Sequence, residues 1–169
     1  MPSTISAPPT AAPSCACASP RSTWVPGPPQ LLLFAIISMV FLGLLLPCAR
    51  LVDPAWRLLA LPPLAAGIAL NLFADRAFKV AKTTVKPLLP STSLVTGGVF
   101  RLTRNPMYLG FVLLLLSLWL ALGALSPGLS VVLFALLIDR YFVRPEEKKL
   151  AATFGDAYPT YRQRVRRWI

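Results

Sequence analysis

The chain has 169 residues, of which 56% are apolar and 14% are charged, and its mean hydropathy is +0.65. A soluble domain of this length could not bury so much apolar surface, so the composition predicts an integral membrane protein. The formal charge of +11 does not indicate a nucleic acid partner, because the basic residues flank apolar runs and form no separate hydrophilic domain.

Residues 1–29 are rich in proline, alanine and serine, a composition that predicts disorder. They lack the basic start and early apolar stretch of a secretory signal. Cys15 and Cys17 lie in this segment and Cys48 follows later, and their spacing matches no metal or redox site. Lipidation of the first two cysteines is a weak alternative. We expect the membrane domain to cover residues 30–169.

Four apolar runs follow, each near the length of a membrane span. They cover about residues 30–47, 54–74, 107–125 and 128–143. Pro62 and Pro63 interrupt the second run and predict a kink there. The segment 126–128 (Ser-Pro-Gly) predicts a tight turn that makes the third and fourth runs a helical hairpin. The expected fold class is therefore an all-α integral membrane protein with about four transmembrane helices.

Basic residues are unevenly distributed around these runs. The loop over residues 76–105 carries six basic residues and no acid, and the chain from Arg140 onward carries eight basic residues against three acids. The turn between the third and fourth runs carries no charge. Because positively charged loops stay in the cytoplasm, four spans would place both termini, the loop and the tail on that side. We also expect basic residues to contact anionic membrane lipid.

The C-terminal tail, residues 145–169, is predicted to be helical and cytoplasmic. Pro145 suits the first position of a helix, and the two acids after it suit the first turn. Gly155 and Pro159 are expected to interrupt this helix. The last nine residues mix arginines with aromatic and aliphatic residues, which is typical of a segment lying on lipid headgroups.

A polar cluster precedes the third run, and an acidic pair follows the fourth. In the first, Arg104 and Asn105 stand before Pro106, which suits a helix start whose free N–H groups attract electron-rich groups. If both runs cross the bilayer, Glu146 and Glu147 return to the same membrane face. Taken alone, each motif also has a structural interpretation. Asn105 could be an N-cap, and Glu146 and Glu147 could be ordinary acids of a first helical turn. Together they predict a site.

Other polar candidates are few. Asn71 and Asp75 share a helix face at the end of the second run, and Asp75 and Lys79 are spaced as a helical ion pair. The chain has no histidine, which excludes the common catalytic triads and histidine zinc sites. We therefore expect no metal.

Short motifs follow one another over roughly residues 55–169. They are Thr83–Pro87, Leu94–Arg101, Arg104–Gly110, Glu146–Glu147, Leu150, Phe154–Gly155, Tyr158, Tyr161, Val165 and Arg167–Trp168. This ordered set resembles the membrane methyltransferases of the isoprenylcysteine carboxyl methyltransferase and phospholipid methyltransferase superfamily. There, an Arg-His-Pro-x-Tyr-x-Gly element, a hydrophobic hairpin and a Glu-Glu pair form the S-adenosylmethionine site. Here 35 residues separate Gly110 from Glu146, enough for one hairpin.

The resemblance implies methyl transfer from S-adenosylmethionine to a hydrophobic or lipid-linked acceptor with a carboxylate, amine or thiol. It implies catalytic roles for Arg104 and Glu147. The implied cofactor-binding residues are Gly97, Arg104, Asn105, Pro106, Tyr108, Leu109, Gly110, Glu146 and Glu147. Asn105 replaces the family histidine and cannot take a proton at neutral pH. An acceptor that must lose a proton would then need Glu146, Glu147 or Asp75.

Two other classes of function compete with this interpretation. Sterol reductases resemble the superfamily in their membrane architecture and use a nicotinamide cofactor, but this chain is short for them and keeps an Asn-Pro-x-Tyr-x-Gly form. A non-catalytic membrane protein is the second, because the family histidine is absent. A channel or transporter is disfavoured, since the runs hold almost no polar residue at mid-depth.

Overall fold

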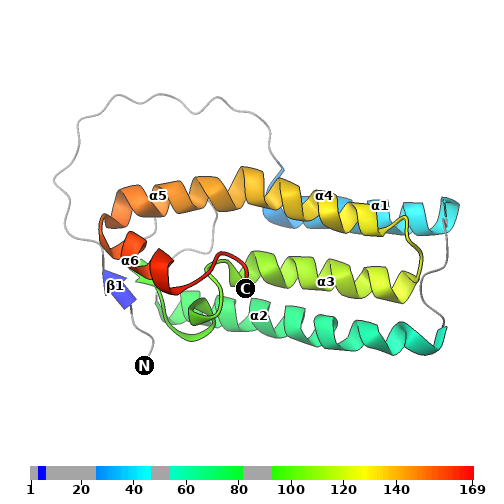
Figure 1. Ribbon diagram of the computed structural model, residues 1–169, viewed down its shortest axis with the longest axis horizontal. Coiled ribbons are helices and arrows are strands. Elements are labelled where there is room, and N and C mark those ends of the chain that lie inside the picture. The colour runs from blue at the N-terminus through cyan, green and yellow to red at the C-terminus, as the bar shows by residue number, and fades with distance from the viewer. Residues whose placement is uncertain (1–3, 7–25, 47–53, 82–92) are drawn as a thin grey trace.

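The computed structural model describes residues 4–6, 26–46, 54–81 and 93–169. Most of this part is helical, and its longest helices lie side by side along the long axis of the molecule (Figure 1). These helices are α1 (Pro28–Leu45), α2 (Leu61–Val80), α3 (Pro106–Leu122) and α4 (Gly128–Ile138). Shorter elements gather at one end of the bundle (Figure 1), namely β2 (Ser93–Val95), the 3-10 helix η2 (Gly98–Arg101), α5 (Arg144–Phe154) and α6 (Ala157–Arg164). The predicted all-α class is confirmed.

The N-terminal segment lies mostly outside the described residues, as do Cys15, Cys17 and Cys48. Within it, Thr4–Ser6 form a short strand, β1, that pairs antiparallel with β2. The prediction of disorder for residues 1–29 did not anticipate this strand. Helix α1 starts at Pro28, where a missing N–H group is harmless in a first turn.

The second apolar run forms two helical pieces. A 3-10 helix, η1 (Pro54–Ala60), leads into α2, and Pro62 and Pro63 lie in the first turn of α2. The change from the 3-10 helix to α2 falls at these two prolines, which break no hydrogen bond of α2 because they lie in its first turn. The kink at this point stays a prediction. Helix α2 also continues to Val80, beyond the predicted end near residue 74. The predicted Asp75–Lys79 ion pair forms at 2.6 Å.

Helices α2 and α3 approach each other closely at two glycines. A Cβ atom on Gly67 would lie 2.9 Å from the Gly110 carbonyl oxygen, and one on Gly110 would collide with the amide of Asn71. Small residues at a helix crossing permit such close approach. The Asn71 amide donates to the Gly67 carbonyl at 2.9 Å. Asn71 thus belongs to this helix crossing.

The predicted helical hairpin of α3 and α4 is present. Helix α3 ends at Gly123, which adopts the left-handed conformation (φ +69°), and the turn leads into α4 at Gly128. The Trp119 indole donates to the Ala124 carbonyl at 2.8 Å inside this turn. The Ser126 hydroxyl donates to the Leu46 carbonyl at 2.6 Å, so the turn is fastened to the end of α1.

The chain does not break between α4 and the tail. A π-helical turn, Asp139–Val143, joins α4 to α5 in one continuous rod (Figure 1). Pro145 would clash with a carbonyl one turn earlier in a regular α-helix, and the wider π turn before it relieves that clash. Pro145 lies in the first turn of α5, as predicted, and the π turn makes α5 continuous with α4. Gly155 (φ +50°) ends α5 as predicted, whereas Pro159 lies inside α6.

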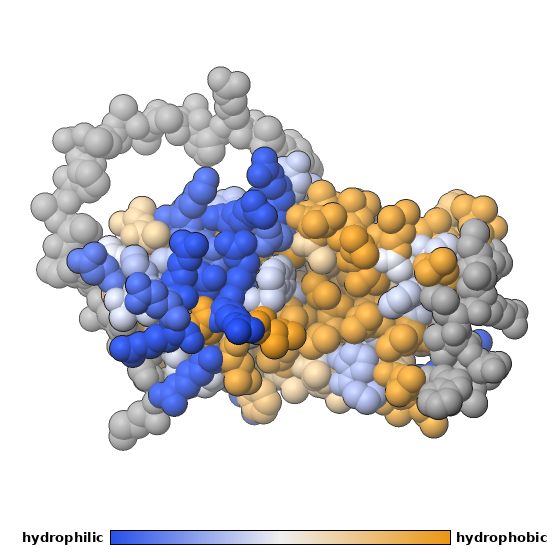
Figure 2. Space-filling view, in the orientation of Figure 1, coloured by the Kyte–Doolittle hydropathy of each residue, from blue (hydrophilic) through white to orange (hydrophobic). Residues whose placement is uncertain are grey.

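Two helices in the described part are long and apolar enough to cross a membrane: Pro28–Leu45 and Arg57–Val80. Helix α3 is apolar but shorter. Figure 2 shows apolar side chains over the helical bundle and hydrophilic side chains over the end that carries α5 and α6. Many large apolar side chains on α1 and α2 are exposed, including Phe34 at 62% and Leu72 at 53%. A contiguous apolar surface of this kind is typical of a protein that faces lipid.

Candidate active site

The start of α3 and the first turn of α5 meet through an ion pair. The Arg104 Nη1 atom lies 3.0 Å from Glu147 Oε1, and the two side chains are only 8% and 10% exposed. The α3–α4 hairpin thus brings the polar cluster and the acidic pair together, as the sequence predicted. Because a charge this deep is costly without a partner, each side chain depends on the other.

A second arginine, Arg167, binds the same carboxylate from the C-terminal segment. Its Nη2 atom lies 2.7 Å from Glu147 Oε2, and its Nε atom donates to Oε1 at 3.2 Å. The Arg167 Nη1 atom also lies 3.4 Å from Asp139, which pairs with Arg144 at 2.7 Å. The hydrogen bonds to Glu147 raise the pKa of Arg167 above its usual range. The result is a network of three guanidinium groups and two carboxylates.

The backbone of the C-terminal segment is also fastened to the start of α3. The Arg104 N–H donates to the Arg166 carbonyl at 3.1 Å. The Arg167 carbonyl accepts from the Thr103 hydroxyl at 3.0 Å and from the Asn105 amide at 3.3 Å. Asn105 occupies the N-cap position of α3, but in the described structure its side chain makes no capping bond. Its amide holds the C-terminal segment instead.

The neighbouring acid, Glu146, has different surroundings. Its Oε1 atom accepts a hydrogen bond of 2.7 Å from the Tyr108 hydroxyl of α3. Burial raises the pKa of Glu146 to about 7, although the Tyr108 hydrogen bond and the charge of Lys149 act in the opposite direction. Glu146 is thus paired with a phenol hydroxyl, whereas Glu147 is paired with two guanidinium groups.

Two buried tyrosines of α6 form hydrogen bonds with residues of the site and of η2. The Tyr158 hydroxyl accepts from Arg104 Nη1 at 3.4 Å, and the Tyr161 hydroxyl donates to the Phe100 carbonyl of η2 at 2.6 Å. Burial raises the pKa of both phenols. Both hydroxyls therefore stay protonated and fix the turn that leads into Arg104.

One buried donor at the centre has no partner in the described part of the chain. It is the Nε atom of Arg104, whose side chain is 8% exposed. A buried guanidinium N–H left without an acceptor is costly, and such groups usually serve a ligand or an ordered water. The first turn of α3, beside it, likewise lacks a side-chain cap in this structure. Both features favour a bound anion or another electron-rich group at this point.

The other predicted site residues are placed less centrally. Pro106 is fully buried at the first position of α3, and Leu109 is half-buried one turn along. Gly97 is buried where η2 begins. Gly110 packs against α2. The structure therefore gathers Arg104, Asn105, Tyr108, Glu146 and Glu147, and the cofactor and catalytic roles of these residues stay predictions.

The sequence did not single out three members of the network: Asp139, Tyr158 and Arg167. Arg167 and Tyr158 do occur in the ordered motifs, so position within those motifs was the available signal. Asp139 pairs with both Arg144 and Arg167. Within the described residues, no group of three or more histidine, cysteine, aspartate or glutamate side chains is placed to hold a metal ion.

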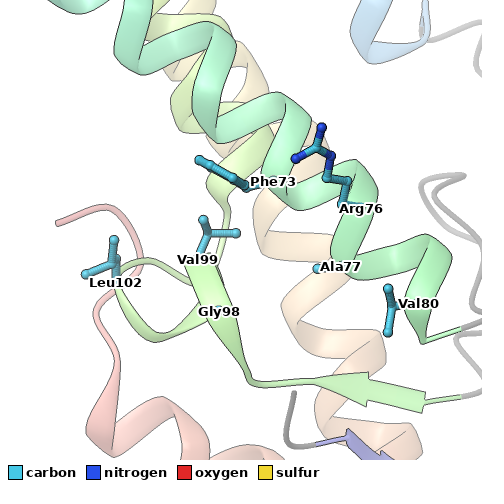
Figure 3. Close-up of a pocket in the computed structure, with 7 residues that line it drawn as sticks. All are labelled: Phe73, Arg76, Ala77, Val80, Gly98, Val99 and Leu102. Carbon is cyan, nitrogen blue, oxygen red and sulfur yellow. The ribbon is translucent and has the colours of Figure 1, made fainter. Parts of the chain in front are cut away.

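An open apolar cavity of about 500 Å³ lies near this site, between the end of α2 and η2 (Figure 3). It is lined by Phe73, Arg76, Ala77, Val80, Gly98, Val99 and Leu102. Its η2 wall immediately precedes Thr103 and Arg104 in the chain, and Arg76 is the charged residue of its lining. The mostly apolar lining of the cavity suits an apolar group.

The chain was compared with proteins of known sequence. Over 75 residues it is 36% identical to a protein-S-isoprenylcysteine O-methyltransferase from Schizosaccharomyces pombe, a match that covers 43% of this chain and 30% of the yeast protein. Over 63 residues it is 43% identical to an uncharacterized protein from Haemophilus influenzae, covering 37% of this chain and all of that protein. Residues 56–157, more than half of the chain, match the family described as phospholipid methyltransferase. This protein therefore belongs to the phospholipid methyltransferase family.

Proposed function

We propose that this protein transfers a methyl group from S-adenosylmethionine to a hydrophobic or lipid-linked acceptor in the membrane. Membership of a methyltransferase family implies a methyl donor. The observation that carries the proposal is the buried, unsatisfied Nε of Arg104, which lies beside a carboxylate pair and an uncapped helix start.

The residues present fit this cofactor. S-Adenosylmethionine carries a carboxylate, an amino group and ribose hydroxyls. The Arg104 guanidinium and the free N–H groups at the start of α3 would bind the carboxylate, since both favour an anion. Glu146 and Glu147 of α5, which contact Tyr108 and Arg104, would accept hydrogen bonds from the amino group or the ribose hydroxyls. Asn105 would contribute indirectly, by holding the C-terminal segment in place.

S-Adenosylmethionine supplies an electrophilic methyl group on a sulfonium. The protein has to hold the acceptor in line with that methyl group and to exclude water. A carboxylate acceptor is already ionised and needs no base. An amine or thiol acceptor must lose a proton, which Asn105 cannot take, whereas Glu146 has a pKa of about 7. Glu147, paired with two arginines, would hold Arg104 and Arg167 in place around the cofactor.

We further propose four membrane spans with both termini and the site in the cytoplasm. Support comes from the four helices that lie side by side and from the concentration of basic residues at the end of the bundle that holds the site (Figures 1 and 2). Positively charged segments stay on the cytoplasmic side. An acceptor with an apolar chain would then enter sideways from the lipid and occupy the apolar cavity of Figure 3.

A non-catalytic role is a second candidate, and one observation favours it. Asn105 replaces the family histidine, and its amide is used to bind the Arg167 carbonyl. A protein of this kind would bind S-adenosylmethionine without transferring its methyl group. Incubation with labelled S-adenosylmethionine and fractionated membrane extract separates the two candidates, because transfer labels a product and a non-catalytic protein labels none.

Cofactor binding is tested first, by isothermal titration of the detergent-purified protein. We expect S-adenosylmethionine to bind the wild type, and Arg104→Ala and Glu147→Gln to abolish or greatly weaken binding. Arg144→Ala is the matched control, since Arg144 belongs to the same network, is 52% exposed and pairs with Asp139. Absent binding in a folded wild type, or equal binding by Arg104→Ala, would overturn the site. Preferential binding of a reduced nicotinamide would support a reductase.

A further inference from the structure

The segment that follows α6 has two different sides. Val165 is in an extended conformation (φ −125°, ψ 132°), so successive side chains point in opposite directions. Val165 is buried and Arg167 is half-buried, whereas Arg164 and Arg166 are exposed. Arg162, in the last turn of α6, is exposed as well.

The inner side of this segment is occupied by the site. The Arg166 and Arg167 carbonyls accept hydrogen bonds from the start of α3, and the Arg167 guanidinium binds Glu147. Any force that holds the segment in place therefore also holds Glu147 and Arg104 in place.

The outer side carries charge that the described part of the chain does not neutralise. Arg162, Arg164 and Arg166 form no ion pair there. Most of the described acids are already engaged: Asp75 with Lys79, Asp139 and Glu147 with arginines, and Glu146 with Tyr108. Three exposed guanidinium groups within five residues thus present donors to something outside the chain.

The position of these arginines indicates what that partner is. Hydrophilic side chains cover the end of the molecule with α5 and α6, and an apolar surface begins directly beside them (Figure 2). The chain then ends in Ile169, an apolar residue that is 81% exposed. A basic segment that adjoins lipid-facing surface meets the headgroup layer of the bilayer, which is rich in phosphate.

We propose that Arg162, Arg164 and Arg166 bind the phosphates of anionic phospholipids, and that this contact holds the C-terminal segment against the candidate site. The proposal concerns lipid binding and does not depend on the proposed methyl transfer. Guanidinium groups bind phosphate through paired hydrogen bonds, which favours arginine for this role.

The size of the effect follows from the charge. Each basic residue facing an anionic surface strengthens binding about fivefold at moderate ionic strength, so removing two arginines should weaken binding about thirtyfold. Because exposed charges are screened by salt, the difference should shrink at high ionic strength.

The test compares two double variants of equal charge. Arg164→Gln/Arg166→Gln alters the proposed surface, and Arg50→Gln/Arg57→Gln removes two arginines from the chain between the first and second apolar runs. Each full-length protein, in zwitterionic detergent without cofactor, is titrated with phosphatidylglycerol or phosphatidylcholine while its melting temperature is followed. We expect phosphatidylglycerol to stabilise the wild type and the control variant. The half-saturating concentration should rise about thirtyfold in Arg164→Gln/Arg166→Gln.

A second measurement follows the C-terminal segment directly. Carboxypeptidase removal of the last residues should be slowed by phosphatidylglycerol in the wild type and the control, but not in Arg164→Gln/Arg166→Gln. If that variant does not fold, Arg162→Gln replaces it with an expected fivefold change. Equal responses of the two double variants, equal effects of the two lipids, or the same stabilisation by water-soluble glycerol phosphate would each overturn the proposal.

Discussion

Replacing Glu147 by glutamine is the sharpest test of the ion network. The wild-type carboxylate forms an ion pair with Arg104 at 3.0 Å and accepts two hydrogen bonds from Arg167, at 2.7 and 3.2 Å. Glutamine keeps the size of the side chain but removes its charge and turns part of it into a donor. Arg104, 8% exposed, would then hold a buried charge without a counterion. Removing one partner of a buried pair costs about 3–5 kcal/mol of unfolding free energy.

For a chain of this length, each kcal/mol corresponds to about 2–4 °C in melting temperature, so Glu147→Gln should lower it by about 6–20 °C. The assay is thermal melting of detergent-purified protein at pH 7. Asp75→Asn is the matched control, because the Asp75–Lys79 pair is 38% and 72% exposed and such a pair is worth less than about 1 kcal/mol. A loss in Glu147→Gln no larger than in Asp75→Asn would refute the reasoning.

A double-mutant cycle separates the interaction between Arg104 and Glu147 from the other effects of each substitution. If Arg104 and Glu147 stabilise each other, the double variant Arg104→Gln/Glu147→Gln should lose clearly less than the two single losses combined. Losses that simply add would show that the two side chains do not interact, whatever their separate effects.

Two further predictions concern neighbouring features. Burial raises the pKa of Glu146 from 4.5 to about 7 in the folded protein, so the folded state holds this proton to a higher pH than the unfolded state does. The free energy of unfolding of the wild type should therefore fall by about 3 kcal/mol as the pH rises from about 4.5 to 7. Glu146→Gln should lack this fall and melt above wild type at pH 8 but not at pH 4.5; parallel pH curves would contradict it. Gly110→Ala should lose about 1–3 kcal/mol by thermal melting, since its Cβ would collide with Asn71. Gly43→Ala, whose Cβ meets only ordinary contacts from 3.5 Å, should lose nothing.

The features that the sequence predicted well are those that depend on long patterns. Apolar runs gave the helices, and the segment 126–128 gave the hairpin turn. Once the hairpin was known, the meeting of Arg104 with the acidic pair followed from connectivity alone. Features that depend on one competing contact were not predictable. Asn105 before Pro106 fits an N-cap, yet its side chain donates a hydrogen bond to the Arg167 carbonyl and makes no capping bond to α3.

The continuous helix through residues 128–154 has a similar explanation. Pro145 is equally compatible with a helix start and with a π turn ahead of it, because both avoid the clash with the preceding turn. Packing of Phe142 and Val143 into the core, at 3% and 0% exposure, favours continuation. Arg167 was equally hard to single out, since several arginines stand close together in the tail and only its inward direction distinguishes it from Arg166.

The adjacent acids show most clearly what structure adds to sequence here. Neighbours on a helix point about 100° apart, so Glu146 and Glu147 face different elements although their sequence context is nearly the same. Glu146 meets the Tyr108 hydroxyl in a poorly solvated position, whereas Glu147 meets Arg104 and Arg167. Burial in the first arrangement raises the pKa of Glu146, whereas the second arrangement makes Glu147 the link between two arginines. In a chain without histidine, Glu146 is therefore the candidate to take a proton in the proposed transfer, and Glu147 is the residue that joins the start of α3 to the C-terminal segment.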